Sequence, residues 1–133
     1  MYEVTINRGR RTISFRASGT LSLDELKTVY EEAMWATDAF RGEKHIVLAD
    51  MRGMSAMGEA ATKIFGDIIR YGRTRGTVCC VHLSDSSIAR LQTNRLAREA
   101  SAYDDITVNV VSVEEAQRVI DEKQAELRGA KAR

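Results

Sequence analysis

The sequence of 133 residues contains no proline and only two cysteines. These cysteines, Cys79 and Cys80, are neighbours within an apolar stretch. Successive side chains of a strand point to opposite faces of the sheet, so such neighbours cannot easily form a disulfide with each other. A redox pair would also need the Cys-x-x-Cys spacing. We therefore expect two buried thiols in a reducing compartment.

The sequence also lacks an excess of charge and a long apolar run. Lysine and arginine number 20 and aspartate and glutamate 19, so the formal net charge is +1. This balance produces no global field that would attract nucleic acid or an anionic membrane. No apolar stretch approaches the roughly 18 residues of a membrane span, and the first residues do not form a secretion signal. We expect a cytoplasmic protein that neither binds nucleic acid nor spans a membrane.

Motifs for metals, nucleotides and catalysis are missing as well. The chain has no His-x-x-x-His, Asp-x-Asp, glycine-rich dinucleotide or Walker pattern, so we expect neither a metal nor another cofactor. His45 and His82 could join Asp50, Ser84 or Asp85 in acid–base chemistry. Both histidines lie within or beside apparent strands, where an ordinary structural role is favoured. We therefore expect that the protein is not an enzyme.

Alternating and uninterrupted apolar runs predict the strands of one domain. An apolar fraction of 44% and a charged fraction of 29% are typical of a globular chain of this length. Polar–apolar alternation predicts a hairpin, and short continuous apolar runs predict strands covered on both faces. The predicted strands span residues 2–8, 12–18, 45–50, 77–83 and 107–111. We expect a domain over residues 1–128 and a frayed tail over 129–133.

Helices are predicted between these strands and after the last one. Ser22 with Glu25, and Ser112 with Glu115, have the spacing of capping boxes that begin helices. The predicted helices span residues 22–37, 59–73, 88–101 and the stretch after 112, and the second should be the most deeply buried. The predicted core-facing residues are Leu23, Leu26, Tyr30, Ala33 and Thr37 in the first helix and Val113, Ala116, Ile120 and Leu127 in the last.

This order of elements, together with four short segments, resembles the STAS family and its SpoIIAA-like branch, the fold of the anti-anti-sigma factors. The matching segments are Gly19 with Leu21-Ser22, Asp50-Met51-Arg52-Gly53, the glycine before Thr77-Val78, and Val111-Ser112-Val113-Glu114-Glu115-Ala116. The resemblance implies an α/β fold with a mixed sheet of four or five strands flanked by four helices. It also implies a regulatory protein–protein interaction module whose partner is an anti-sigma factor, a kinase-like protein or a sensor protein.

One family feature is altered in this chain. In anti-anti-sigma members, the loop after the central strand leads to an Asp-Ser-Ser or Asp-Ser-Thr motif whose hydroxyl is phosphorylated. The matching residues here are Gly58, Glu59 and Ala60, which carry no hydroxyl. Glu59 could imitate a phosphorylated state permanently or could simply favour the start of a helix. Ser55 is the nearest remaining hydroxyl and an alternative phosphorylation site.

The sequence also predicts two surfaces that could contact a protein partner, and it suggests one alternative function. On a helical wheel, Trp35 falls on the side away from the core-facing residues, where it could contact a regulatory partner or a second copy of the chain. Arg90, Asn94 and Arg98 form a polar stripe that could contact an acidic partner. The alternative function is small-molecule or lipid binding, because SpoIIAA-like chains resemble Sec14-type lipid carriers in architecture.

Overall fold

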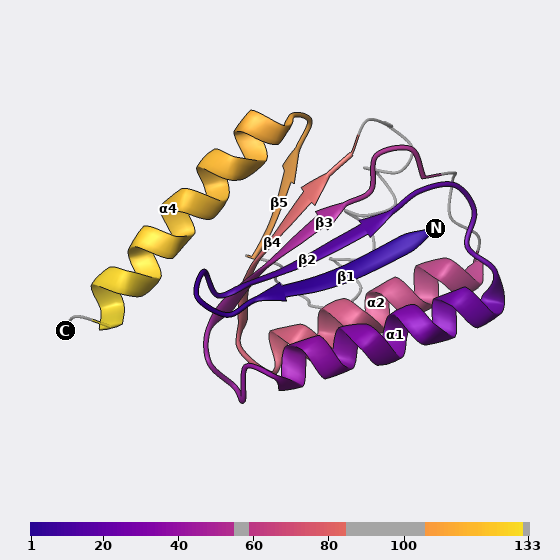
Figure 1. Ribbon diagram of the computed structural model, residues 1–133, viewed down its shortest axis with the longest axis horizontal. Coiled ribbons are helices and arrows are strands. Elements are labelled where there is room, and N and C mark those ends of the chain that lie inside the picture. The colour runs from indigo at the N-terminus through magenta and orange to yellow at the C-terminus, as the bar shows by residue number, and fades with distance from the viewer. Residues whose placement is uncertain (55–58, 85–105, 132–133) are drawn as a thin grey trace.

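The computed structural model describes residues 1–54, 59–84 and 106–131 (Figure 1). In chain order the elements are β1 (Tyr2–Asn7), β2 (Thr12–Ala17), α1 (Leu23–Asp38), β3 (His45–Asp50), α2 (Glu59–Arg73), β4 (Thr77–Leu83), β5 (Thr107–Val110) and α4 (Val113–Lys131). The described part is thus an α/β domain with five strands and three helices, which confirms the predicted class. The helix predicted over 88–101, with Arg90, Asn94 and Arg98, lies outside the described residues.

The five strands form one mixed sheet in the order of the sequence, with β3 at its centre as predicted. β1 and β2 form the predicted antiparallel hairpin, in which Tyr2 pairs with Ala17. The pairs β2–β3, β3–β4 and β4–β5 are all parallel. Since parallel neighbours end at the same edge of a sheet, β2 to β5 share a carboxyl edge.

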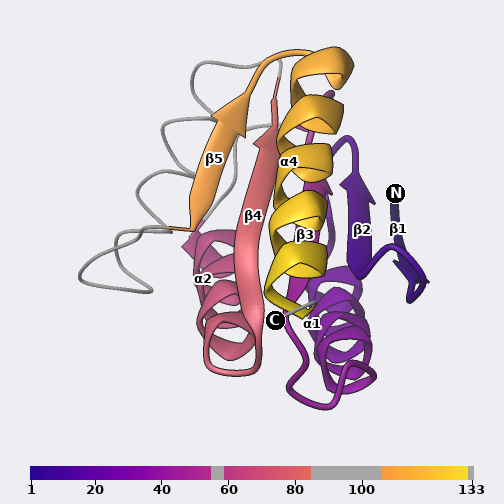
Figure 2. The same cartoon turned by 90° about the vertical axis from the view of Figure 1, so that its left-hand side faces the viewer.

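Helices cover the two faces of the sheet unequally. α1 and α2 lie side by side on one face, and α4 lies across the other (Figures 1 and 2). A right-handed crossover between parallel strands places successive helices on the same face, as seen for α1 and α2. Each of these two helices runs back against the strands. Both therefore begin at the carboxyl edge of the sheet and end at the opposite edge.

Each face of the sheet has its own hydrophobic core. On the face covered by α1 and α2, Phe15 meets Phe65 edge to face, with ring centroids 5.6 Å apart and an interplanar angle of 70°. The core under α4 includes Ile46, Val81 and Ile120. Cys79 packs in the core under α4, whereas Cys80 faces the other side. Both cysteines are buried, as predicted, neither forms a disulfide, and burial raises the pKa of Cys79.

Both predicted capping serines begin their helices. The Ser22 hydroxyl accepts from the Glu25 N–H at 3.1 Å, and the Glu25 carboxylate accepts from the Ser22 N–H at 3.1 Å. At α4, Ser112 likewise accepts from the Glu115 N–H at 3.1 Å. The Glu115 carboxylate accepts from the Val111 N–H at 3.3 Å, one residue earlier than in a complete capping box. No helix in the described ranges has the length and apolarity needed to cross a bilayer.

The predicted inner faces of α1 and α4 need correction at their first residues. Leu23 is 55% exposed and Val113 is 51% exposed, and each is the first residue of its helix. In α1, Val29 and Ala36 are buried in addition to the predicted Leu26 and Thr37. The buried stripe of α1 is thus rotated away from Leu23.

Two further expectations about the helices differ from the structure. Ile64, Ile68 and Ile69 of α2 are only partly buried, so α2 is not the most deeply buried helix of the described part. α4 continues to Lys131, so the helix includes three residues of the tail that was expected to fray, and residues 132–133 are not described.

A buried glutamine joins α4 to the hairpin turn. The Gln124 side-chain amide donates to the Arg10 carbonyl at 2.7 Å and to the Thr12 hydroxyl at 3.3 Å, and its oxygen accepts from Arg10 Nη2 at 3.2 Å. Asp121, one turn earlier, accepts from the same guanidinium at 3.3 Å. No sequence pattern predicts this contact, which fixes the hairpin against the end of α4.

Candidate functional site

The turn that follows β3 is organised by the carboxylate of Asp50. This side chain accepts from the Arg52 backbone N–H at 3.2 Å, from Arg52 Nε at 2.9 Å and from Arg52 Nη2 at 2.8 Å. Arg16, on β2, adds a longer contact of 3.5 Å. The Asp50 side chain is only 13% exposed. The segment Asp50-Met51-Arg52-Gly53, which carried part of the family resemblance, is therefore a hydrogen-bonded turn at the carboxyl edge.

Ionisation of Asp50 is favoured by these contacts. The hydrogen bond from the Arg52 side chain is the largest influence that lowers the pKa of Asp50, and it outweighs the opposing effect of burial. A carboxylate with a lowered pKa is a weaker base, and its oxygens are already occupied by the guanidinium of Arg52. The geometry assigns Asp50 the role of fixing the turn.

A pair of glycines places the loop beside the end of β2. The Gly19 N–H donates to the Gly53 carbonyl at 2.9 Å, and Met54 forms an isolated bridge with Gly19. Gly53 has φ +79°, a left-handed conformation that L side chains rarely adopt. The loop therefore leaves β3 and crosses toward the end of β2 before it reaches the start of α2.

Glu59 and Ala60, two residues of the segment that resembles the family's phosphoacceptor motif, lie at that start. Glu59 is the first residue of α2, and both Glu59 and Ala60 are exposed. A carboxylate in the first turn is favoured by the helix dipole. Gly58 and the alternative site Ser55 fall outside the described residues. The structure thus places a carboxylate at the helix start, and its described neighbour Ala60 carries no hydroxyl.

Trp35 is exposed on the outer side of α1, as the helical wheel predicted. Its side chain is 69% accessible, the largest exposure among the described aromatic residues. Glu31, Glu32 and Asp38 stand three or four residues away along the helix and thus flank it. All three are exposed. A large apolar ring therefore stands among carboxylates on the surface of the molecule.

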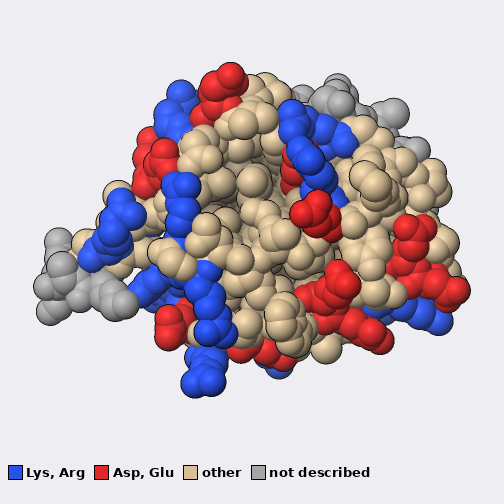
Figure 3. Space-filling view, in the orientation of Figure 1, with Lys and Arg blue, Asp and Glu red and all other residues tan. Residues whose placement is uncertain are grey.

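The surface of α1 is acidic along its length. The helix carries five carboxylates, at Asp24, Glu25, Glu31, Glu32 and Asp38, against the single lysine Lys27. Its last turn contains no basic residue. In Figure 3 acidic side chains gather over the lower right, where α1 lies in Figure 1, whereas basic side chains gather at the left, near the hairpin turn and the end of α4. We call the outer side of α1 around Trp35 the acidic surface.

The structure does not bring Glu59 and Trp35 together. The Tyr71 hydroxyl, near the end of α2, donates to the Asp38 carboxylate at the end of α1 with an O–O distance of 2.6 Å. Trp35 therefore lies near the ends of the two helices, whereas Glu59 lies at the start of α2. Twelve helical residues separate Glu59 from Tyr71, a rise of about 18 Å. The two predicted contact points belong to opposite ends of the helical layer.

The two histidines occupy separate places in the sheet. His45 begins β3 and Asp50 ends it, about 16 Å away at the usual strand rise. His82 pairs with Ala49 in the register, so it shares a face with Ala49 and lies on the opposite face from Asp50. The structure therefore separates both histidines from Asp50, and Asp85, which was also considered for acid–base chemistry, lies outside the described residues. In the described ranges, no three His, Cys, Asp or Glu residues gather as metal ligands.

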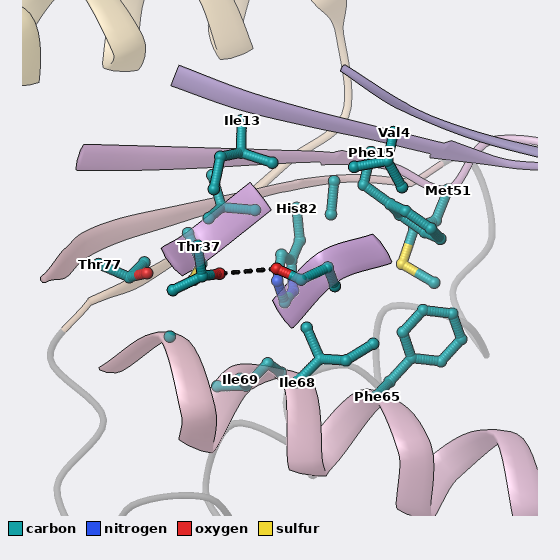
Figure 4. A pocket seen from close by; sticks show the side chains of 15 residues that line it. Val4, Ile13, Phe15, Thr37, Met51, Phe65, Ile68, Ile69, Thr77 and His82 are labelled. Carbon is teal, nitrogen blue, oxygen red and sulfur yellow. Dashed lines mark hydrogen bonds between the residues drawn. The ribbon is translucent and has the colours of Figure 1, made fainter. Parts of the chain in front are cut away.

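A cavity that the sequence did not predict lies between the sheet and helices α1 and α2. Its volume is about 70 Å³. Figure 4 shows Phe65, Ile68 and Ile69 of α2 facing Ile13, Phe15 and Met51 across it. The remaining described lining residues are Val4, Ala33, Thr37, Val47, Ala49, Gly72, Thr77, Cys80 and His82.

Comparison with known proteins gave no match for this chain, either among protein-family models or among curated proteins.

Proposed function

We propose that the protein is a regulatory interaction module of the anti-anti-sigma type, which acts by binding a protein partner. The observation that carries this proposal is the exposure of Trp35 within the acidic surface of α1. Exposed tryptophan is a favoured anchor of protein interfaces, since its large ring gains much from burial in a dry pocket. The family resemblance of the sequence and the α/β topology both agree with such a module.

The charge around Trp35 defines the kind of partner. Five carboxylates and one lysine on α1 favour a partner with a basic surface that surrounds an apolar pocket. A homodimer formed through this helix would bring like charges together. We therefore favour a different protein, such as a kinase-like anti-sigma factor or a sensor protein, over a second copy of the chain.

The altered phosphoacceptor region suggests a constitutive form of the module. Glu59 offers a fixed negative charge where the family has a regulated one, so partner binding would not depend on phosphorylation at that position. A Glu59→Gln variant removes this charge and keeps the shape. If Glu59 imitates a phosphate, the variant changes partner affinity. If Glu59 only favours the helix start, affinity stays unchanged and stability falls by about 0.3–1 kcal/mol.

The test is affinity capture with three immobilised forms of the full chain: wild type, Trp35→Ala and Leu23→Ala. Leu23 is a matched control because it is also an exposed apolar residue of α1 but lies twelve positions away. We expect a kinase-like or sensor protein to be retained by wild type and Leu23→Ala, lost with Trp35→Ala, and released by added salt. Retention of the same protein by Trp35→Ala contradicts the assigned surface, and the absence of any regulatory protein contradicts the function.

A further inference from the structure

We propose that the cavity between the sheet and helices α1 and α2 binds a small, uncharged apolar molecule. This inference goes beyond the proposed function, because it concerns the interior of the domain and needs no protein partner. It rests on the origin of the cavity, the chemistry of its wall and its size.

The cavity arises from small side chains at facing positions. α1 contributes Ala33 and β3 contributes Ala49 to the wall. The larger side chains of α2, Ile68 and Ile69, are only partly buried and leave the space between the layers unfilled. Protein interiors are close-packed and contain few voids larger than a water molecule. A void of this size between two layers is therefore an unusual packing feature, and a small molecule can fill it.

The wall selects against charged and strongly polar occupants. None of the described residues that line it is Asp, Glu, Lys or Arg. The hydroxyl and imidazole groups of the wall belong to Thr37, Thr77 and His82, and the two threonine hydroxyls already have partners in the fold. The Thr37 hydroxyl donates to the Ala33 carbonyl at 2.8 Å, and the Thr77 hydroxyl lies 2.8 Å from Nε2 of His45 (Figure 4 shows the first). A charged ligand would lose its hydration without gaining a counter-charge from these residues.

The volume limits the size of the occupant. A dry cavity of about 150 Å³ lined by Leu, Ile and Phe can hold benzene or xenon. At about 70 Å³, this cavity fits a xenon atom or an apolar group of a few heavy atoms. The lipid-carrier alternative suggested by the sequence would need a much larger interior, and we therefore assign the cavity to a small apolar ligand.

Xenon is a suitable probe because it binds apolar cavities without hydrogen bonds. We would record ¹H–¹³C methyl spectra of the full chain under increasing xenon pressure. The expected result is a saturable shift of the methyl signals of Val47 and Ile68, which line the cavity, and no shift for Val119 under α4. Shifts that are linear in pressure, or equal on both faces of the sheet, would overturn the proposal.

Matched variants test the location. Ala33→Leu adds three carbons at the cavity wall, whereas Ala125→Leu makes the same change on the exposed surface of α4. We expect the saturable shift to disappear in Ala33→Leu and to persist in Ala125→Leu. If Ala33→Leu does not fold, Ala49→Val fills the same space with two carbons and should weaken xenon binding at least tenfold. Unchanged binding in the folded filling variant would contradict the assignment.

Discussion

Nε2 of His45 lies 2.8 Å from the hydroxyl of Thr77, and Nδ1 of the same ring lies 2.9 Å from the carbonyl oxygen of Glu43. A carbonyl oxygen can only accept, so Nδ1 carries the proton and Nε2 accepts from the Thr77 hydroxyl. The ring is fully buried and stacks on Phe40 with centroids 4.6 Å apart. These contacts join the start of β3 to the start of β4 and fix a neutral imidazole.

This arrangement predicts that the domain loses stability in mild acid. Burial lowers the pKa of His45 below its ordinary value of 6.5. The unfolded chain then binds more protons than the folded chain below that value. Stability should be constant above about pH 6.5, fall as the pH decreases toward the lower folded pKa, and then level off. Urea unfolding between about pH 8 and pH 5 measures this trend. A His45→Gln variant should show a weaker dependence, and an equal dependence in the variant would assign the effect to another group.

The turn after β3 should depend on the charge of Asp50. An Asp50→Asn variant keeps the shape but replaces charge-assisted hydrogen bonds to Arg52 with weaker ones, which should cost roughly 1–2 kcal/mol of unfolding free energy. Arg52 lowers the pKa of Asp50 below its ordinary value of 3.8. As the pH falls below that value, the wild type should therefore lose the stability that the ionised Asp50 contributes. Asp121→Asn is the control, since its ion pair with Arg10 is exposed and should contribute less than about 0.5 kcal/mol. Equal losses in the two variants would contradict the role given to Asp50.

The fluorescence of the only tryptophan reports directly on the acidic surface. Trp35 is exposed in the free chain, so its emission and its quenching by acrylamide should resemble those of the unfolded protein. Binding of a partner through this surface should shift the emission to shorter wavelength and reduce quenching. Trp35→Ala should leave the melting temperature nearly unchanged, because few contacts are lost. A melting temperature well below that of the wild type would place Trp35 in the core.

Filling the cavity should stabilise the domain. Ala49→Val places two carbons in a void of about 70 Å³, and a void of this size costs roughly 1–2 kcal/mol at the usual penalty per unit volume. We expect thermal or urea unfolding to show a gain of up to about 1 kcal/mol. Ala36→Val is the matched control. Ala36 is fully buried and is not among the residues that line the cavity, so the added carbons should crowd the packed core and this variant should lose stability. If both variants lose stability, a side chain added at position 49 of β3 does not fill the void.

Much of the sheet could be predicted from the sequence. The limits of β3 and β4 match the predicted runs 45–50 and 77–83, since uninterrupted apolar stretches are typical of strands covered on both faces. α1 and α4 begin where Ser22 and Ser112 predict, because a cap depends only on residues a few positions apart. Trp35 was placed correctly for the same reason, since several neighbouring turns determine the phase of the helix.

The features that could not be predicted depend on how separate helices and strands are placed relative to one another. Leu23 and Val113 are apolar and close to the core-facing side, yet both are exposed at the first residue of their helices, and no local pattern records how much of a helix is covered. Gln124 is polar in the sequence but is buried because the hairpin turn happens to lie opposite it. The cavity arises from the volumes of side chains on separate elements, such as Ala33 and Ala49. These features become visible only when the layers are assembled.

The mixed sheet also has a consequence for how the chain acquires its structure. Among the described strands, β1 and β2 form the one pair that a tight turn can join, and such a hairpin forms in about 1–10 μs. The three parallel pairs each require a crossover to be completed first, which makes folding slower. During synthesis the hairpin leaves the ribosome before α1 and α2, so the apolar face of β2, with Ile13 and Phe15, stays uncovered in the nascent chain until these helices pack on it. That interval is when the protein most needs protection from aggregation.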